Sequence, residues 1–204
     1  MSGSADAIPY TDADVAYVTG EFVVLEELAH AGGRATHEIE RGIAARRLPQ
    51  PTYVLPDGRR FVPADYLVLA DASGGSEHVH DAFVARLEAA ARAAGVDVDP
   101  EGEWSAYLSG EYGVCLREVS PESIVQKTAL MDRIQGLLDD PDESSAAWRE
   151  DLVSAVDRLD RLERPFAPDY DRRRFGSPLS RDRLITGVRA SYPDTFAQPG
   201  PVSR

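Results

Sequence analysis

The sequence has one cysteine, four histidines and no long apolar run, and each shortage excludes a class of protein. Because Cys115 has no partner, the chain can form neither an internal disulfide nor a cysteine-rich zinc site, and four scattered histidines leave little for a histidine-based one. The apolar runs fall far short of the roughly 20 residues that span a bilayer, and residues 1–7 lack the features of a signal peptide. We therefore expect a soluble, cytoplasmic protein without a membrane segment, a metal or another cofactor.

Positive charge is also scarce, with 22 lysines and arginines against 35 acidic residues and a formal net charge of −13. Such a chain repels a polyanion at long range, although a local basic face can still bind one. The 204 residues are 43% hydrophobic, which suffices for one ordinary globular domain or two small ones.

The chain divides at residues 71–76, where turn formers and flexible glycines follow one another. Before this boundary, Thr11 and Asp14 have the spacing of a capping box that opens a short helix. Two further helices are predicted around a turn at Gly32 and Gly33, the second reaching Leu48. Strands at 52–55 and 59–62 flank a Pro-Asp-Gly turn and predict a β-hairpin. We expect residues 1–70 to form one module.

Residues 76–204 are predicted to form an all-helical module with a frayed tail from Gln198, so the fold class is mostly α. Helices are expected at 77–94, 101–108, 121–139, 145–163 and 181–190. Ser120 and Pro121 open the third, and Ser180 is expected to cap the last. The predicted apolar stripes contain Phe83, Leu87, Ala90, Ala91 and Ala94 in the first helix, Ile124, Thr128, Met131 and Leu138 in the third, and Trp148, Leu152, Ala155, Val156, Leu159 and Leu162 in the fourth.

Residues 23–69 resemble the DNA-binding domain of the mercury-resistance regulator (MerR) family. The resemblance lies in Leu25–Ala29, Ala31–Gly32, Ile39, Leu48–Pro51, Asp57–Phe61 and Asp65–Leu67. It implies a winged helix-turn-helix in which the helix within residues 34–47 enters the major groove and the wing, at 56–61, reaches the DNA backbone.

Local charge leaves DNA binding open. Residues 34–60 carry a net charge of +3, and the candidate DNA contacts are Arg34, Arg41, Arg46, Arg47, Arg59 and Arg60. Glu38 and Glu40, however, flank Ile39 where the family usually presents threonine and arginine, and a carboxylate near phosphate is repulsive. The alternative, which we favour, is a winged module kept as a scaffold, since fold does not imply function.

The whole sequence, including Tyr107–Leu116 and Arg174–Arg183, is similar to an uncharacterised actinobacterial family found among natural-product biosynthesis genes. The resemblance implies a role in specialised metabolism and carries no catalytic residues.

A second arginine group lies between Arg164 and Arg189, where seven arginines and three acids give a net charge of +4. The planar guanidinium pairs well with carboxylate or phosphate, and a helix start at Ser180 could add donors. We predict a site for an anionic small molecule or a carrier-tethered intermediate, formed by Arg172, Arg174, Ser180, Arg181 and Arg183 with Trp104, Tyr107 and Tyr112. Alternatively, the arginines pair with the acids of residues 97–163, and the aromatic residues belong to the core.

Three hypotheses follow. The first is a biosynthesis-associated protein that binds an anionic small molecule in its helical half. The second is a MerR-like regulator, acting on DNA as a homodimer. The third is an enzyme with Cys115 as nucleophile, although no base or positive charge stands near it in the sequence, and a buried structural thiol is the alternative.

Overall fold

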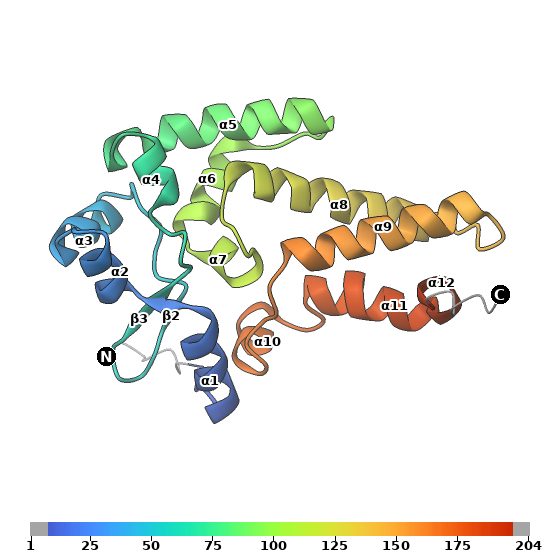
Figure 1. Ribbon diagram of the computed structural model, residues 1–204, viewed down its shortest axis with the longest axis horizontal. Coiled ribbons are helices and arrows are strands. Elements are labelled where there is room, and N and C mark those ends of the chain that lie inside the picture. Colours follow the sequence, from blue (N-terminus) through green and yellow to red (C-terminus); the bar gives the residue numbers. More distant parts are fainter. Residues whose placement is uncertain (1–7, 198–204) are drawn as a thin grey trace, which may run out of the picture.

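The computed structural model describes residues 8–197 and is mostly helical, with one small antiparallel sheet (Figure 1). The predicted fold class is confirmed at this level, and the tail predicted from Gln198 lies outside the described residues. The elements up to residue 72 are α1 (Asp12–Glu21), β1 (Val23–Val24), α2 (Leu25–Ala31), α3 (Thr36–Ala44), β2 (Tyr53–Val54), β3 (Arg60–Val62) and α4 (Val68–Ala72). After it come the 3-10 turn η1 (Ser76–His78), α5 (Val79–Ala94), α6 (Pro100–Leu108), α7 (Glu111–Cys115), α8 (Pro121–Asp139), α9 (Ala146–Leu162), α10 (Tyr170–Phe175), the π-helical turn η2 (Asp182–Thr186), α11 (Gly187–Ser191) and α12 (Pro193–Phe196).

The predicted capping box is present at the start of α1. The Asp14 amide donates to Thr11 Oγ1 at 3.2 Å, and the Thr11 amide donates to Asp14 Oδ2 at 2.9 Å. The other oxygen of Asp14 accepts the backbone N–H groups of Asp169 and Tyr170 at 2.9 and 3.0 Å. One buried carboxylate thus both caps α1 and holds the start of α10 against it.

The predicted hairpin is also present. Strands β2 and β3 pair antiparallel with Tyr53 opposite Phe61, and Gly58 adopts the positive φ, 87°, that its turn requires. A third strand that was not predicted, β1, pairs with the other edge of β3, giving the order β1-β3-β2.

Helix α3 ends at Ala44, before the predicted end near Leu48. Two backbone N–H groups, of Arg47 and Leu48, turn back onto the carbonyl of Gly42 at 2.8 and 3.2 Å. The Leu48 side chain lies over Gly42, where an added Cβ would come within 2.7 Å of it. The glycine therefore allows Leu48 to fold under the helix and enter the core.

Helices α5, α8 and α9 pack side by side, with α8 between the other two (Figure 1). The predicted stripe of α9 is buried, except for the half-buried Leu162. In α8 the predicted stripe lies at the margin of the buried face: Met131 and Leu138 are half-buried and pack against the core, and Thr128 is half-buried. The reason is that α8 has neighbours on two sides, so that its buried face is wider than one stripe and contains Ile124, Val125, Leu130, Ile134 and Leu137. In α5 the prediction is wrong for Ala94, which is exposed.

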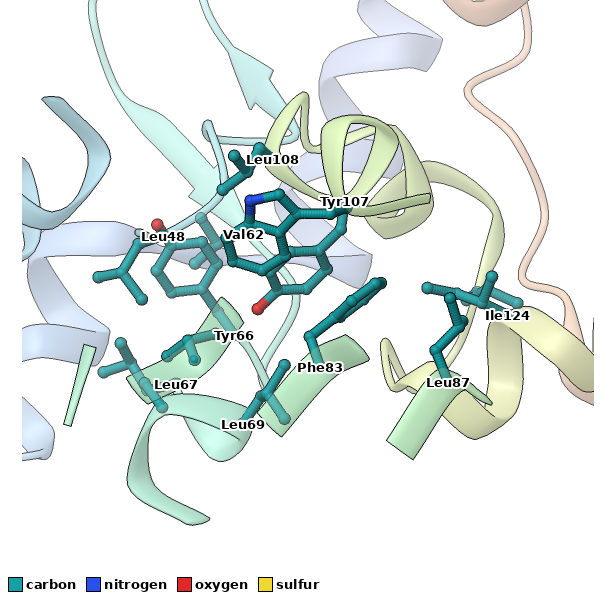
Figure 2. Packing of buried hydrophobic residues seen from close by; sticks show 14 of the residues in the cluster. Leu48, Val62, Tyr66, Leu67, Leu69, Phe83, Leu87, Tyr107, Leu108 and Ile124 are labelled. Atoms are coloured by element: carbon teal, nitrogen blue, oxygen red, sulfur yellow. The ribbon is translucent and has the colours of Figure 1, made fainter. Parts of the chain in front are cut away.

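The hydrophobic core crosses the boundary expected at residues 71–76. In Figure 2, Val62 and Tyr66 from the N-terminal part lie in one cluster with Phe83, Tyr107 and Ile124 from the helical part. A smaller cluster joins Tyr53 and Phe61 of the sheet to Val114 and Ala167. The two parts therefore share buried surface.

Candidate ligand-binding site

A cavity of about 300 Å³ lies where α6 and α7 face α8 and the segment that follows α9. Its apolar wall is formed by Ala106, Val114, Phe166, Phe175, Pro178 and Leu179. Its polar wall is formed by Glu111, Tyr112, Cys115, Lys127 and Ser180. Volumes of this size are at the lower end of those of small-molecule sites, so the space suits a small metabolite.

A short backbone pairing brings two walls of this cavity together. Leu116 and Glu163 form an isolated antiparallel bridge, in which the Arg164 amide donates to the carbonyl of Cys115 at 2.9 Å. The Arg117 amide donates to the Leu162 carbonyl at 3.0 Å. The end of α7 is thereby fixed beside the end of α9, which places Cys115 next to the Glu163 side chain.

The central interaction at this junction is an ion pair between Lys127 of α8 and Glu163. Lys127 Nζ lies 2.8 Å from Glu163 Oε1, the Glu163 side chain is fully buried, and the Lys127 side chain is 14% exposed. Ser180 donates its hydroxyl to the same Oε1 at 3.2 Å. Glu163 Oε2 is buried and has no hydrogen-bond partner. The buried Glu163 carboxylate does not line the cavity itself, and it fixes the position of the Lys127 ammonium in the cavity wall.

Cys115 and Lys127 influence each other's protonation. Burial raises the pKa of the Cys115 thiol, and the Lys127 ammonium opposes part of this increase. Burial acts to lower the pKa of Lys127, but Cys115 and Glu163 together outweigh it, so the pKa of Lys127 is raised. At neutral pH the pair is accordingly a neutral thiol beside a charged ammonium. Cys115 is then a weak nucleophile, whereas Lys127 offers a fixed positive charge.

Sequence reasoning missed Lys127 and Glu163. Lys127 is the only lysine of the chain, because arginine supplies every other basic side chain apart from histidine. Its being the single lysine was the one feature of the sequence that could have drawn attention to it. Lysine and arginine are not interchangeable, since the ammonium is a compact charge on a flexible stem. Nothing in the sequence indicated that Glu163, one of many acids, would be its partner.

The predicted site residues are only partly brought together. Tyr112 and Ser180, which were predicted for one site, both line the cavity, and so does Cys115, which was considered separately as a nucleophile. The expectation that Ser180 caps a helix is wrong, because its hydroxyl is used on Glu163 and η2 has no side-chain cap. Trp104 and Tyr107 instead lie in the core, stacked with their ring centroids 5.3 Å apart.

The arginines of residues 164–189 are largely used within the protein. Arg172 pairs with Asp182 at 2.9 Å, Arg181 pairs with Asp160, and Arg189 pairs with Asp157 and Asp160, both at 2.7 Å. Arg174 donates to the Thr52 carbonyl at 3.1 Å. Arg183 is exposed, and none of the ion pairs within residues 8–197 includes it. None of these five arginines lines the cavity, and most of them attach the C-terminal segment to its neighbours.

The arginines of the N-terminal part are paired in a similar way. Arg34 pairs with Asp71, Arg59 with Asp57 at 2.7 Å, Arg41 with Glu38 at 4.0 Å, and Arg60 with both Glu26 and Glu40. Arg46 and Arg47, just after α3, are exposed and belong to none of the ion pairs of the described chain.

Fold and cavity together define a mostly helical protein with one small sheet and a metabolite-sized pocket in its helical part. The chain belongs to DUF6058, a family of unknown function, whose model matches residues 76–193. These residues include the whole cavity wall and both members of the Lys127–Glu163 pair. No curated protein and no solved structure matches the chain. In the part of the chain that the structure describes, every helix is too short or too polar to cross a membrane.

Proposed function

We propose that this protein takes part in specialised metabolism by binding an anionic small molecule, free or tethered to a carrier, in the cavity of its helical part. The anion is bound by Lys127, and residues 23–69 are a MerR-like winged helix used as a scaffold. The observation that carries the proposal is the only lysine of the chain, held in the cavity wall by a fully buried carboxylate.

The energetics of the ion pair support a binding role. Replacing a buried ion pair by well-packed apolar residues is often neutral or stabilising by about 1–4 kcal/mol, so stability alone is a weak reason for such a pair. An ammonium has three N–H donors, of which Glu163 accepts one and Cys115 lies beside another. The third is available to a carboxylate or phosphate oxygen in the cavity.

The charge pattern of the N-terminal part supports scaffold use. Four of the six arginines that the DNA hypothesis needs already contact carboxylates, and a DNA phosphate would approach those acids as well. Arg46 and Arg47 alone offer a small basic surface, which keeps a MerR-like regulator as the second candidate.

The proposal is tested by titrating 4-methylpentanoate and 3-phenylpropanoate into the purified protein by calorimetry. Wild type is expected to bind at least one of these acids, and Lys127→Met is expected to bind it at least tenfold more weakly. Arg183→Met is the control, because it removes one exposed positive charge outside the cavity.

Lys127→Met leaves the buried Glu163 without a partner, so the double variant Lys127→Met/Glu163→Leu is tested alongside it. This variant removes both charges and is expected to fold, as followed by circular dichroism, but not to bind the acids. Equal affinity of wild type and the folded double variant for these acids and for the corresponding α-amino acids, leucine and phenylalanine, would overturn the proposal.

A further inference from the structure

We infer that the ligand of this cavity is a zwitterion, an α-amino acid with an apolar side chain, whose ammonium group pairs with Glu111. The inference rests on the proposed function, since it keeps Lys127 as the partner of the ligand's carboxylate. It adds the second charged end of the ligand and the residue that recognises it.

Glu111 supplies the observation. Its side chain lines the same cavity, is exposed, and takes part in no ion pair within the described part of the chain. Other exposed acids of the described chain, Glu118 and Glu150 among them, also belong to no ion pair, and Glu111 differs from these two in lining the cavity. Glu111 is thus a carboxylate at the cavity whose charge the protein does not compensate by itself.

Charge balance then favours a ligand with both signs. The positive charge of Lys127 is already neutralised by Glu163, and Glu111 adds one negative charge. These three side chains together therefore carry a net charge of about −1 by simple Coulombic counting. A simple anion would gain from Lys127 but be repelled by Glu111. An amino acid offers a carboxylate to the first and an ammonium to the second, and so uses both.

The spacing within α7 agrees with this orientation. Glu111 and Cys115 are the first and last residues of the helix, four positions apart, and side chains with this spacing lie on one face about 5–6 Å apart at Cβ. Lys127 lies beside Cys115. The cavity therefore has its negative and positive groups about one helical turn apart, which a single small zwitterion can bridge.

The remaining wall defines the rest of the ligand. Phe166, Phe175 and Leu179 are apolar and face the same space, and the volume of about 300 Å³ suits an amino acid better than a nucleotide cofactor. The Ser180 hydroxyl donates its one hydrogen to Glu163 Oε1, so Lys127 is the donor at the carboxylate end. We therefore expect leucine, methionine or phenylalanine to bind better than small or acidic amino acids.

The test compares each of these three amino acids with its deaminated acid by calorimetry, in wild type, Glu111→Gln and Glu118→Gln. Glu118 is the matched control, because it is exposed, lies near Glu111 in the chain and does not line the cavity. At least one amino acid is expected to bind wild type tenfold or more tightly than its deaminated acid. Glu111→Gln is expected to abolish this advantage, and Glu118→Gln to preserve it.

The outcomes separate the two proposals. If a deaminated acid binds as tightly as its amino acid, and Glu111→Gln changes neither affinity, the zwitterion is excluded while the anion site of Lys127 stands. If neither the acids nor the amino acids bind wild type more tightly than Lys127→Met/Glu163→Leu, both proposals fail. If 2-phenylethylamine binds as tightly as phenylalanine, the carboxylate has no role and the inference is overturned.

Discussion

Lys127 and Glu163 form a 2.8 Å ion pair in which the acid is fully buried and the base reaches the wall of a cavity. The two residues come from α8 and from the end of α9, and the bridge between Leu116 and Glu163 sets their approach. The pair therefore connects the packing of the helical part with the chemistry of its cavity.

Removing one member of this pair is expected to cost far more stability than removing both. Lys127→Met leaves a buried carboxylate uncompensated, and we expect a loss of about 3–5 kcal/mol in the free energy of unfolding. Lys127→Met/Glu163→Leu should lie within about 2 kcal/mol of wild type, because no isolated charge remains. Urea denaturation measures both, and equal stability of the single and double variants would contradict this account.

The thiol of Cys115 is expected to react slowly. Because burial raises its pKa, little thiolate is present at pH 7, and alkylation by iodoacetamide should be at least tenfold slower than in the urea-unfolded protein. Loss of the nearby ammonium in Lys127→Met/Glu163→Leu should slow it further at pH 8. Mass spectrometry follows the adduct, and a folded-state rate above the unfolded one at pH 7 would instead indicate an activated nucleophile.

Asp14 is expected to make folding stability depend on acid pH. Burial acts to raise its pKa, but the hydrogen bonds from Tyr170, Thr11 and Asp169 prevail, so the pKa is lowered in the folded state. A carboxyl group of this kind stabilises the fold above its unfolded pKa, near 3.9, and the contribution is lost as the pH falls through the folded value. Asp14→Asn should therefore cost about 1–3 kcal/mol at pH 7 and progressively less below pH 4.

The measurement for this prediction is urea denaturation of wild type and Asp14→Asn between pH 2.5 and 7. Asp12→Asn is the control, since Asp12 is an exposed residue in the first turn of the same helix. A difference between wild type and Asp14→Asn that does not change with pH would show that the charge of Asp14 has no part in its capping role.

The scaffold hypothesis predicts no specific DNA binding. Fluorescence anisotropy with the DNA upstream of the protein's own gene, at two salt concentrations and with competitor DNA, is expected to show only weak, salt-sensitive binding. The double variant Arg46→Ala/Arg47→Ala is expected to show no sequence-specific DNA binding either, so that it differs from wild type at most in its weak, salt-sensitive binding. Tight binding that survives competitor and is lost in this variant would establish the regulator instead.

Much of the secondary structure could be predicted because its causes are local. The capping box of Thr11 and Asp14, the turn at Gly58 and the opening of α8 at Ser120 depend on residues only a few positions apart. The short elements α7, α10 and α12 have too few residues for a periodic pattern, and sequence reasoning missed them. Their formation depends on packing against distant parts of the chain.

The sequence by itself determined a mostly helical protein with a capped first helix, a glycine-turned hairpin and long amphipathic helices, because propensity, capping and periodicity act between near neighbours. It also marked two arginine groups without showing their partners. Only the tertiary structure decided that these arginines contact the protein's own acids, and that Cys115, Lys127 and Ser180 meet at one cavity in front of Glu163. Such contacts join residues far apart in the chain, where composition and spacing contain no information about distance.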